Sequence, residues 1–311
     1  MSPIIVFAFN RLDSLKTTIK ALKFNPEAKD SDLYIFVDGP RPQKKDEAEK
    51  VSQVREYVKT ITGFKSLNYV FSPLNKGLAP SIIEGVTNVI NSYGKAIVVE
   101  DDLYVSKSFL RFMNQMLNTF ENDERIFQIS GFSTKIATHI EGDVYLNGRA
   151  QSWSWATWKD RWDTVDWEVK DFDILCGDRN KQKAFNSHGS DLFVMLRNHK
   201  RGIISSWYVR FCYEMHKQGK YTICPARSLV RNDGFNCEGT HCNNYNRYRI
   251  EFEEEHMREF ILPPFLKPEN NVLQDAIKYW SIRYRIYGKL MTFLNNFIST
   301  LNGRLRKGIR K

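Results

Sequence analysis

Three consecutive acidic residues, Glu100, Asp101 and Asp102, come directly after the apolar run AIVV at residues 96–99. Carboxylates crowded at the end of a buried strand repel one another, and a divalent cation relieves that repulsion. Mg²⁺ and Mn²⁺ prefer few carboxylates together with the phosphate oxygens of a substrate. The triplet therefore indicates a metal–diphosphate site. The alternative is a helix start, because acidic residues favour that position and a helix is predicted to follow.

The elements that position this triplet follow from the hydrophobic pattern of the first third of the chain. Short apolar runs typical of buried strands alternate with patterns in which apolar residues recur every three to four positions, as in amphipathic helices. The expected strands cover residues 4–9, 33–37, 68–71, 96–99 and 127–129, and the expected helices about 12–22, 51–61, 82–90 and 109–120. This alternation predicts an α/β fold with a mostly parallel, Rossmann-like sheet flanked by helices.

Ligands of such a sheet bind at the carboxyl ends of its strands. Besides the acidic triplet, Asn10 and Arg11 follow the first expected strand, and Asp38 follows the second. The segment FAFNRLDS at residues 7–14 has neither the GxGxxG fingerprint nor a P-loop pattern. The sequence therefore argues against a nicotinamide-dependent dehydrogenase and against a P-loop ATPase.

Residues 132–275 are less regular than the first third and are rich in tryptophan. A helix is plausible at 208–217 and a short strand at 221–224, whereas 231–249 resembles a long loop. We find no repeat and no low-complexity linker. We therefore expect residues 1–131 and 132–275 to be two halves of one body, with 276–311 as a tail.

The net charge of +10 belongs mainly to the tail, since residues 276–311 contain nine Lys and Arg and no Asp or Glu. The rest of the chain is nearly neutral, which argues against a nucleic-acid-binding protein. Apolar residues from Ile286 to Leu305 recur every three to four positions. This pattern predicts a basic amphipathic helix, which would make a peripheral contact with an anionic membrane. The alternatives are packing against the body and an oligomer contact.

The remaining composition indicates the compartment. The five cysteines are odd in number and scattered, which fits a reducing environment. No run approaches 18 apolar residues, and the apolar run near Met1 is too short for a signal peptide and has no basic region before it. We expect a cytoplasmic protein, with the tail at the inner face of the membrane.

Six segments resemble those of nucleotide-diphospho-sugar glycosyltransferases of the GT-A type. They are PIIVFAFNR at 3–11, DLYIFVDGP at 32–40, NKGLAPSIIEGV at 75–86, AIVVEDDL at 96–103, SWSWATWKDRW at 152–162 and GFNCEGTHC at 234–242. The chain resembles in particular bacterial polysaccharide glycosyltransferases whose amino-terminal half is similar to N-acetylglucosaminyltransferase I. The segments stand in the expected order and span most of the body, so the resemblance implies a GT-A fold with an irregular acceptor-side region.

The resemblance implies a role for each matched residue that faces the nucleotide. Asn10 and Arg11 would contact the nucleotide, and Asp38 would meet the uracil or ribose edge. Gly77 and Leu78 would let the backbone approach the nucleotide sugar. The alternatives are that Asp38 only forms a turn and that Arg11 only pairs with a surface acid.

The metal site is implied in the same way. Asp102 would coordinate Mn²⁺ or Mg²⁺ bridging the diphosphate, with Glu100 and Asp101 on the sugar or ribose, so that charge on the departing diphosphate is stabilised. His241 would be a further ligand or a diphosphate contact, although a lone histidine is more often structural. Zinc at Cys237 and Cys242 is disfavoured, because no second cysteine pair accompanies them.

One departure from the family concerns the general base that an inverting transferase needs. In N-acetylglucosaminyltransferase I this is an Asp close to a Trp–Arg segment, but the comparable stretch at 204–210, ISSWYVR, contains no acid. We therefore name Asp191 as the first substitute and Glu214 and Glu238 as weaker ones. This departure from the family affects which residue is assigned as the base and whether the reaction inverts the sugar. It does not affect the predicted nucleotide-sugar site.

The tryptophans of the segment SWSWATW at 152–158 have two interpretations. Aromatic rings stack on sugars and line clefts for small molecules. More often, however, such residues pack a hydrophobic core.

Together these features indicate a metal-dependent glycosyltransferase, a hexosyl- or N-acetylhexosaminyltransferase. Its donor would be a UDP-sugar, with UDP-GlcNAc implied by the resemblance, and its acceptor a glycan or lipid-linked glycan in surface polysaccharide synthesis. The alternatives are a catalytically silent nucleotide-sugar-binding protein and a sugar-nucleotide nucleotidyltransferase. The latter typically has a glycine-rich basic loop after the first strand, which FAFNRLDS lacks.

Overall fold

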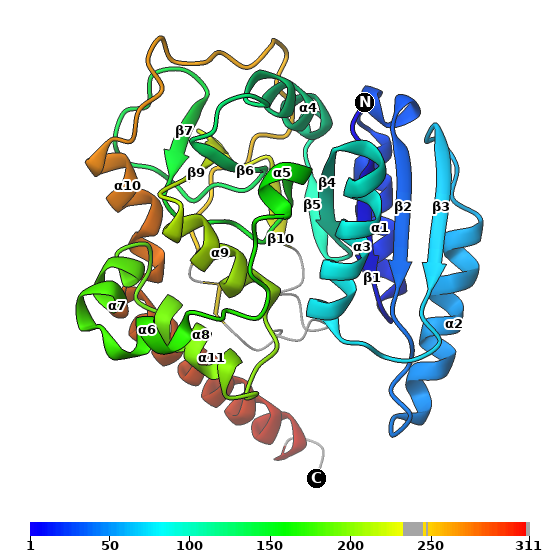
Figure 1. Cartoon of the computed structure of the whole chain (residues 1–311). Coiled ribbons are helices and arrows are strands. Elements are labelled where there is room, and N and C mark those ends of the chain that lie inside the picture. Colours follow the sequence, from blue (N-terminus) through cyan, green and yellow to red (C-terminus); the bar gives the residue numbers. More distant parts are fainter. Residues whose placement is uncertain (233–244, 247, 309–311) are drawn as a thin grey trace.

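The apolar runs of the first third lie side by side as parallel strands in one sheet (Figure 1). The computed structural model describes residues 1–232, 245, 246 and 248–308, and of residues 45 and 297–308 it describes the backbone only. Within these residues the sheet has eight strands in the order β3-β2-β1-β4-β8-β6-β9-β7. The predicted α/β architecture, a mostly parallel sheet flanked by helices, is confirmed.

The elements of the first part of the chain follow the predicted alternation closely. They are β1 (Ile4–Ala8), α1 (Leu12–Lys23), the short 3-10 helix η1 (Pro26–Asp30), β2 (Asp32–Val37), α2 (Lys45–Lys59), β3 (Ser66–Phe71), α3 (Leu78–Tyr93), β4 (Lys95–Glu100), β5 (Leu103–Val105), α4 (Phe109–Thr119) and β6 (Ile126–Ser130).

The second part contains more regular structure than the sequence pattern predicted. Its elements are β7 (Val144–Asn147), β8 (Trp155–Trp158), α5 (Lys159–Trp162), α6 (Phe172–Gly177), α7 (Arg179–Asn186), α8 (Leu192–Lys200), α9 (Trp207–Lys217), β9 (Tyr221–Pro225), β10 (Val230–Asn232), α10 (Asn270–Ile277), the 3-10 helix η2 (Lys278–Trp280) and α11 (Ile282–Gly308).

The central strands are apolar on both faces because helices cover both sides of the sheet. Along β1, Ile4 and Val6 belong to the hydrophobic layer formed with α1, α2 and α4. The alternate residues Ile5 and Phe7 belong to the layer formed with α3, α8 and α9. This alternation explains the uninterrupted apolar run of β1, since successive side chains of a strand point to opposite faces.

Strand β8 joins the two halves of the sheet. It runs antiparallel between β4 and β6, with Val98 opposite Trp155 and Ser130 opposite the same tryptophan. An antiparallel strand begins at the edge where its parallel neighbours end. The residues just before Trp155 are therefore delivered to the carboxyl edge of the sheet, beside the end of β4.

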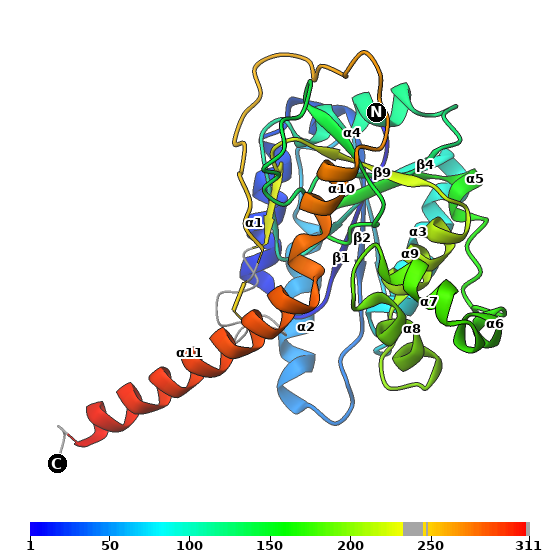
Figure 2. The same cartoon turned by 90° about the vertical axis from the view of Figure 1, so that its left-hand side faces the viewer.

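The tail begins inside the body and then leaves it. Tyr279 and Trp280 of η2 are 2% and 6% exposed and belong to the main core. The following helix, α11, extends away from the body toward the C-terminus (Figure 2). In the described part of the chain, no helix has the length and apolar character needed to cross a bilayer.

Candidate functional site

The acidic triplet meets Arg11 at the carboxyl edge of the sheet. Arg11 precedes α1 directly after β1, and the triplet follows β4, the parallel neighbour of β1. The Arg11 Nη1 donates to Asp102 Oδ2 at 2.9 Å, and its Nη2 contacts Asp101 Oδ1. The Phe9 amide also donates to Asp101 Oδ2, at 3.3 Å. The arginine expected to contact the nucleotide thus lies within the triplet and does not pair with a remote surface acid.

The triplet does not begin a helix, because it turns into strand β5 and α4 starts only at Phe109. The helix-start interpretation is therefore wrong. The free backbone amides of a helix start therefore do not donate hydrogen bonds to these carboxylates. Their negative charge must be balanced by other groups.

The carboxyl groups of the triplet are electrostatically strained. Burial, together with the neighbouring Asp102 and Asp101, raises the pKa of Glu100 to about 8, although Arg11 opposes the shift. Burial likewise raises the pKa of Asp101 to about 6, against the attraction of Arg11. One arginine therefore does not compensate three crowded carboxyl groups.

One oxygen of the triplet has no partner. Asp102 Oδ1 is buried and makes no hydrogen bond, whereas Oδ2 of the same side chain accepts from Arg11. A buried carboxylate oxygen without a partner is costly unless a ligand fills its place. Mg²⁺ and Mn²⁺ are hard ions that accept one or two carboxylates and complete their coordination with phosphate oxygens and water. The donor set fits such an ion.

The described side chains alone do not complete this coordination. Among the described residues, no three or more His, Cys, Asp or Glu side chains are grouped so that they could hold a metal ion. Phosphate oxygens of a substrate are ligands that an ion held by Asp102 would accept in addition.

Asp38 organises a loop beside this cluster. Its carboxylate accepts the backbone amides of Gly39, Lys76 and Gly77, at 2.8, 2.9 and 2.9 Å. A Cβ on Gly39 would lie 2.4 Å from the Leu74 carbonyl carbon, so the two chain segments approach too closely for a side chain. Asp38 thus has the turn-forming role that was the alternative interpretation, and its predicted contact with the nucleotide stays a prediction.

Gly77 and Leu78 form the start of α3 next to that loop. Gly77 has a φ of +79°, a conformation that favours glycine, and a Cβ added there would meet no atom within 4 Å. Leu78 is 53% exposed. Together with Asn10, these residues lie at the same sheet edge as the triplet, so the structure brings the predicted nucleotide-facing residues together. Their individual roles remain predictions.

A cavity of about 620 Å³ lies next to this edge. Trp153, two residues before the start of β8, lines the cavity. Its ring lies 4.6 Å from that of Phe132 and 5.4 Å from that of Tyr248, between ring centroids. The tryptophan-rich segment therefore reaches this cavity with the residues that precede β8.

Most tryptophans of that segment have the core-packing role. Trp155 stacks against Trp207 and Trp162 at 4.8 and 5.7 Å between centroids, and it is 1% exposed. Between Trp153 and Trp155 stands Ser154, a buried residue with a φ of +57° and an unpartnered hydroxyl. Strain of this kind is common at functional sites. The preceding residue, Trp153, packs at the margin of the core and lines the cavity.

Asp191 also lines the cavity but is tied to a buried arginine. Arg149 Nη1 and Nη2 donate to Asp191 Oδ1 and Oδ2 at 2.8 and 3.0 Å. Burial disfavours the charged carboxylate, but Arg149 outweighs burial, so the pKa of Asp191 lies below its usual value. A general base works best with a pKa near the operating pH, so this carboxylate is a weak proton acceptor.

The other predicted bases lie elsewhere or cannot be placed. Glu214 on α9 pairs with Lys217 at 3.0 Å and accepts from Gln218, away from the residues that line the cavity. Glu238 and His241 lie outside the described residues, as do Cys237 and Cys242. The described chain ends before them at Asn232, which pairs with Leu103 next to Asp102.

Some residues of the cavity were not singled out from the sequence. Arg149, Tyr208, Trp280 and Arg285 come from four separate segments, and the sequence pattern gives no sign that they meet. Arg149 stands between Gly148 and Ala150, two small residues that follow the apolar run VYL at 144–146. A buried arginine normally needs a partner, which here is Asp191.

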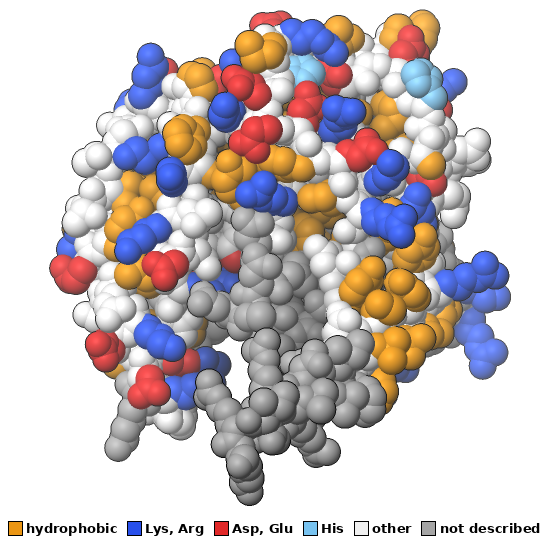
Figure 3. Space-filling model, turned by 180° about the vertical axis from the view of Figure 1, so that it is seen from behind, with side chains coloured by type: hydrophobic (Ala, Val, Ile, Leu, Met, Phe, Trp, Pro, Cys, Tyr) orange, Lys and Arg blue, Asp and Glu red, His pale blue; other side chains and the backbone are white. Residues whose placement is uncertain are grey.

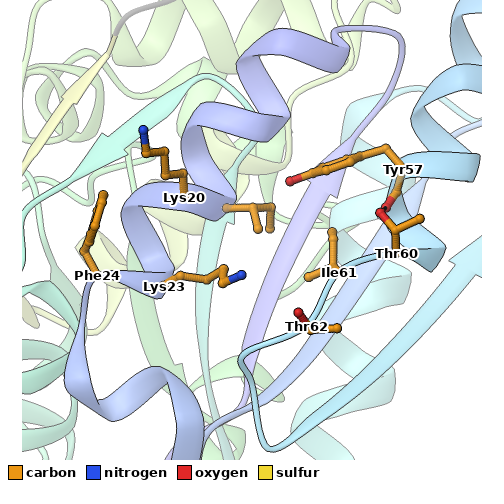
Figure 4. A pocket seen from close by; sticks show the side chains of 8 residues that line it. Lys20, Lys23, Phe24, Tyr57, Thr60, Ile61 and Thr62 are labelled. Atoms are coloured by element: carbon orange, nitrogen blue, oxygen red, sulfur yellow. Dashed lines mark hydrogen bonds between the residues drawn. The ribbon is translucent and has the colours of Figure 1, made fainter.

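A second hollow, of about 380 Å³, lies between α1 and the end of α2 (Figure 4). Lys20, Lys23 and Tyr57 line it. Helix α1 starts at the carboxyl edge of the sheet and runs back, so its end near Lys23 lies at the opposite, amino edge. This hollow is therefore separate from the site at the triplet.

Comparisons with known proteins concern the fold alone. No family model matches the sequence, and no curated protein matches it. A crystal structure of S. aureus TarS 1–349 is similar over 76% of this chain and 61% of that chain, with 8% identity and a TM-score of 0.43. A crystal structure of S. aureus TarS is similar over 45% of this chain and 23% of that chain, with 12% identity and a TM-score of 0.31.

A cytidylyltransferase from Leptospira borgpetersenii is similar over 53% of this chain and 63% of that chain, with 10% identity and a TM-score of 0.32. The chain thus spans less than two thirds of each of these solved chains. With identities this low, the similarity concerns the chain path and assigns no substrate.

Proposed function

We propose that the protein is a metal-dependent glycosyltransferase that transfers a sugar from a UDP-sugar, with UDP-GlcNAc as the expected donor, to a glycan or lipid-linked acceptor in surface polysaccharide synthesis. The observation that carries the proposal is the buried, unpartnered Asp102 Oδ1 in a strained triplet of carboxyl groups at the carboxyl edge of the sheet. The sequence resemblance to GT-A glycosyltransferases supports it.

The residues around Asp102 suit a nucleotide diphosphate. Asp102 would hold Mn²⁺ or Mg²⁺, with Glu100 and Asp101 next to the sugar or ribose. When bound, the ion would supply Lewis-acid stabilisation of the charge on the leaving diphosphate. Arg11 holds Asp102 in place through Oδ2 and adds positive charge where phosphates would lie. The Asp38 carboxylate fixes the backbone of Gly77 at the edge where the nucleotide would approach. Because Gly77 has no side chain, the nucleotide could come close to the backbone there.

The acceptor would lie in the cavity beside Trp153. Of the described residues predicted as the general base, Asp191 lines this cavity and Glu214 does not. Asp191 is ionised at neutral pH, as a base must be, but its pairing with Arg149 makes it weak. This weakness is the observation that favours the second candidate function, a nucleotide-sugar-binding protein without transferase activity.

Hydrolysis of a panel of UDP- and GDP-sugars, with Mn²⁺, Mg²⁺ or EDTA, tests the proposal. We expect metal-dependent release of UDP from one donor, and a rate at least about 100-fold lower in Asp102→Ala, because several kcal/mol of charge stabilisation are lost. Glu56→Ala is the matched control, since Glu56 is an exposed acid on α2 paired only with Lys59 on its own helix.

The outcomes separate the two candidate functions. Metal-dependent UDP binding that Asp102→Ala abolishes, with no turnover even when cell-envelope glycan is supplied, would favour the silent binder. If the protein shows no turnover and does not bind UDP, both candidate functions and the proposed site at Asp102 are rejected.

The tail supports a peripheral membrane contact. Ile282, Ile286, Leu290 and Phe293 of α11 are 62%, 63%, 54% and 66% exposed. Figure 3 shows hydrophobic side chains gathered at the lower right, where α11 crosses this face of the molecule. The sequence beyond adds Arg and Lys from residue 304 onward. An apolar helix face with basic flanks suits an anionic membrane surface, and we propose that α11 lies on one.

Co-sedimentation with vesicles that contain anionic lipid tests this contact. Deleting residues 276–311 would remove core residues such as Trp280, so point variants are preferable. We expect Ile286→Asp with Leu290→Asp to lower vesicle binding strongly. The control is Ile174→Asp with Ile203→Asp, two equally exposed residues elsewhere in the body. Equal sedimentation of both double variants with the wild type would show that α11 makes no such contact.

A further inference from the structure

The cavity beside Trp153 has one wall made by the tail. Arg285, Gly288, Lys289 and Thr292 of α11 line it, and their spacing places them on one face of that helix. The exposed apolar residues of α11, such as Ile286, lie on a different face. The helix therefore has an inner polar face toward the cavity and an outer apolar face.

The inner face is fixed by hydrogen bonds to the body. Arg285 Nη1 donates to the backbone oxygen and the hydroxyl of Ser190, at 3.1 and 3.2 Å. Thr292 Oγ1 accepts the Tyr245 amide at 2.9 Å. The Ser190 hydroxyl also donates to the Trp280 carbonyl at 2.8 Å. These bonds hold Arg285 at the rim of the cavity, so its charge has a defined place there.

The charges that line the cavity do not balance. Arg149 and Asp191 neutralise each other through two hydrogen bonds. Arg285 and Lys289 remain, and no further Asp or Glu is among the described residues that line the cavity. The rest of the lining is rich in aromatic rings, including Trp153 and Trp280. The cavity thus combines two cations in excess over the carboxylates of its lining with aromatic side chains that a sugar can contact.

We propose that this cavity binds an acceptor sugar that carries a phosphate or diphosphate group, with Arg285 and Lys289 contacting the anionic group and the aromatic rings contacting the sugar. The inference rests on the proposed function and names the chemical class of its acceptor. Two sources supply this chemistry, a lipid-linked sugar diphosphate and a soluble sugar phosphate. The tail is then part of the binding site as well as a membrane contact.

Calorimetric titration with three probes tests the inference: decyl-diphosphate-linked N-acetylglucosamine, N-acetylglucosamine 1-phosphate and neutral decyl N-acetylglucosaminide. We expect both anionic probes to bind at least about tenfold more tightly than the neutral one, as charged hydrogen bonds would give. Arg285→Gln with Lys289→Gln should remove this advantage. Arg283→Gln is the control for loss of positive charge from this helix, because it deletes one charge at an exposed position outside the cavity.

A further variant tests the cavity by filling it, without removing a charge. Gly288→Leu places a side chain on the cavity face of α11 and raises the helix propensity of that position. We expect it to weaken all probes about tenfold or more while the protein stays folded in a thermal melt. If the decyl-diphosphate-linked sugar binds more tightly than N-acetylglucosamine 1-phosphate, the acceptor is lipid-linked. If the two probes bind equally, the acceptor is a soluble sugar phosphate.

Three results would overturn the inference: equal affinity for the neutral and anionic probes, unchanged affinity in the Arg285/Lys289 double variant, and no binding of any probe at millimolar concentration. Mn²⁺-dependent UDP binding is measured on the same samples. If UDP binding is intact while the probes fail, the acceptor inference alone is wrong. If UDP binding also fails, the proposed function fails with it.

Discussion

The molecule contains two arginine–carboxylate clusters that use the same residue types for different ends. At Arg149 and Asp191, both carboxylate oxygens are paired and the arginine side chain is 1% exposed. At Arg11, one guanidinium serves two aspartates, a third carboxyl group is near, and Asp102 Oδ1 has no partner. The first cluster is closed and the second is open.

The difference indicates how to tell a structural ion pair from a ligand site. A closed pair satisfies its own charges, so its main effect is to fix the shape of what surrounds it. In an open cluster, the carboxylates repel one another, and a bound cation can relieve that repulsion. Removing a carboxyl group should therefore destabilise the first cluster and stabilise the second.

Breaking the closed cluster should have the largest effect. Asp191→Ala leaves Arg149 buried without its carboxylate, and we expect the free energy of unfolding to fall by about 3–5 kcal/mol. Denaturant unfolding measures it. Asp163→Ala is the control, because Asp163 forms an exposed pair with Lys159 that is worth about 0.5 kcal/mol or less. A loss at Asp191 no larger than at Asp163 would contradict the role of the closed pair.

The closed cluster should also be sensitive to acid through His188. Its carbonyl accepts from Arg149 Nη1 at 3.3 Å, and its ring lies against His216, with 3.2 Å between Nε2 and Nδ1. Burial, with repulsion from His216 and Arg149, lowers the pKa of His188 to about 4. The unfolded chain, with a histidine pKa of about 6.5, binds more protons, so stability falls as the pH drops from about 6.5 toward 4.

We expect the wild type to lose about 1–2 kcal/mol between pH 7 and pH 5 from this histidine. His188→Gln should flatten this part of the curve, leaving the share of His216, whose pKa is also lowered by burial. His139→Gln, at an exposed position, should not. An unchanged acid limb in His188→Gln would show that another group controls it.

The open cluster should respond with the opposite sign. Glu100→Gln removes a carboxyl group whose pKa is raised to about 8 by burial and by Asp102 and Asp101. We expect the free energy of unfolding at pH 7 in EDTA to rise by about 1 kcal/mol, because folding no longer forces that group to take up a proton. A loss of stability would mean that Glu100 has a stabilising partner and that the cluster is not strained.

The smallest effect should come from Ser154 between the two sites. Ser154→Gly relieves a φ of +57° and removes a buried hydroxyl without a partner. Against the greater chain entropy of glycine, we expect a gain of about 0.5 kcal/mol in unfolding free energy. Comparison of urea midpoints measures it. A clear loss would indicate that the hydroxyl is bonded in solution.

The amino-terminal half of the fold could be predicted from the sequence because short apolar runs alternate there with helices of clear amphipathic periodicity. The expected strands at 4–9 and 96–99 correspond to β1 and β4, and helices separate them as predicted. The second half was harder. Strand β8 is four residues of WATW, buried on both faces, and it pairs with β4 and β6 rather than with its sequence neighbours.

The candidate site divides in the same way. Asn10, Arg11 and the triplet each follow a predictable strand, so their meeting at one sheet edge could be expected. The cavity could not, since Arg149, Trp280 and Arg285 come together only through tertiary packing. The partner that makes Asp191 a weak base is likewise a contact across 42 positions of the chain.

The antiparallel direction of β8 has a consequence for how this protein could change its specificity. Parallel strands contribute the residues that follow them to the ligand edge, whereas β8 contributes the residues that precede it. The acidic triplet after β4 and the residues before β8 therefore belong to separate segments of the chain. Substitutions at Ser152 or Trp153 could therefore alter the lining of the cavity while β4 and its triplet keep their sequence.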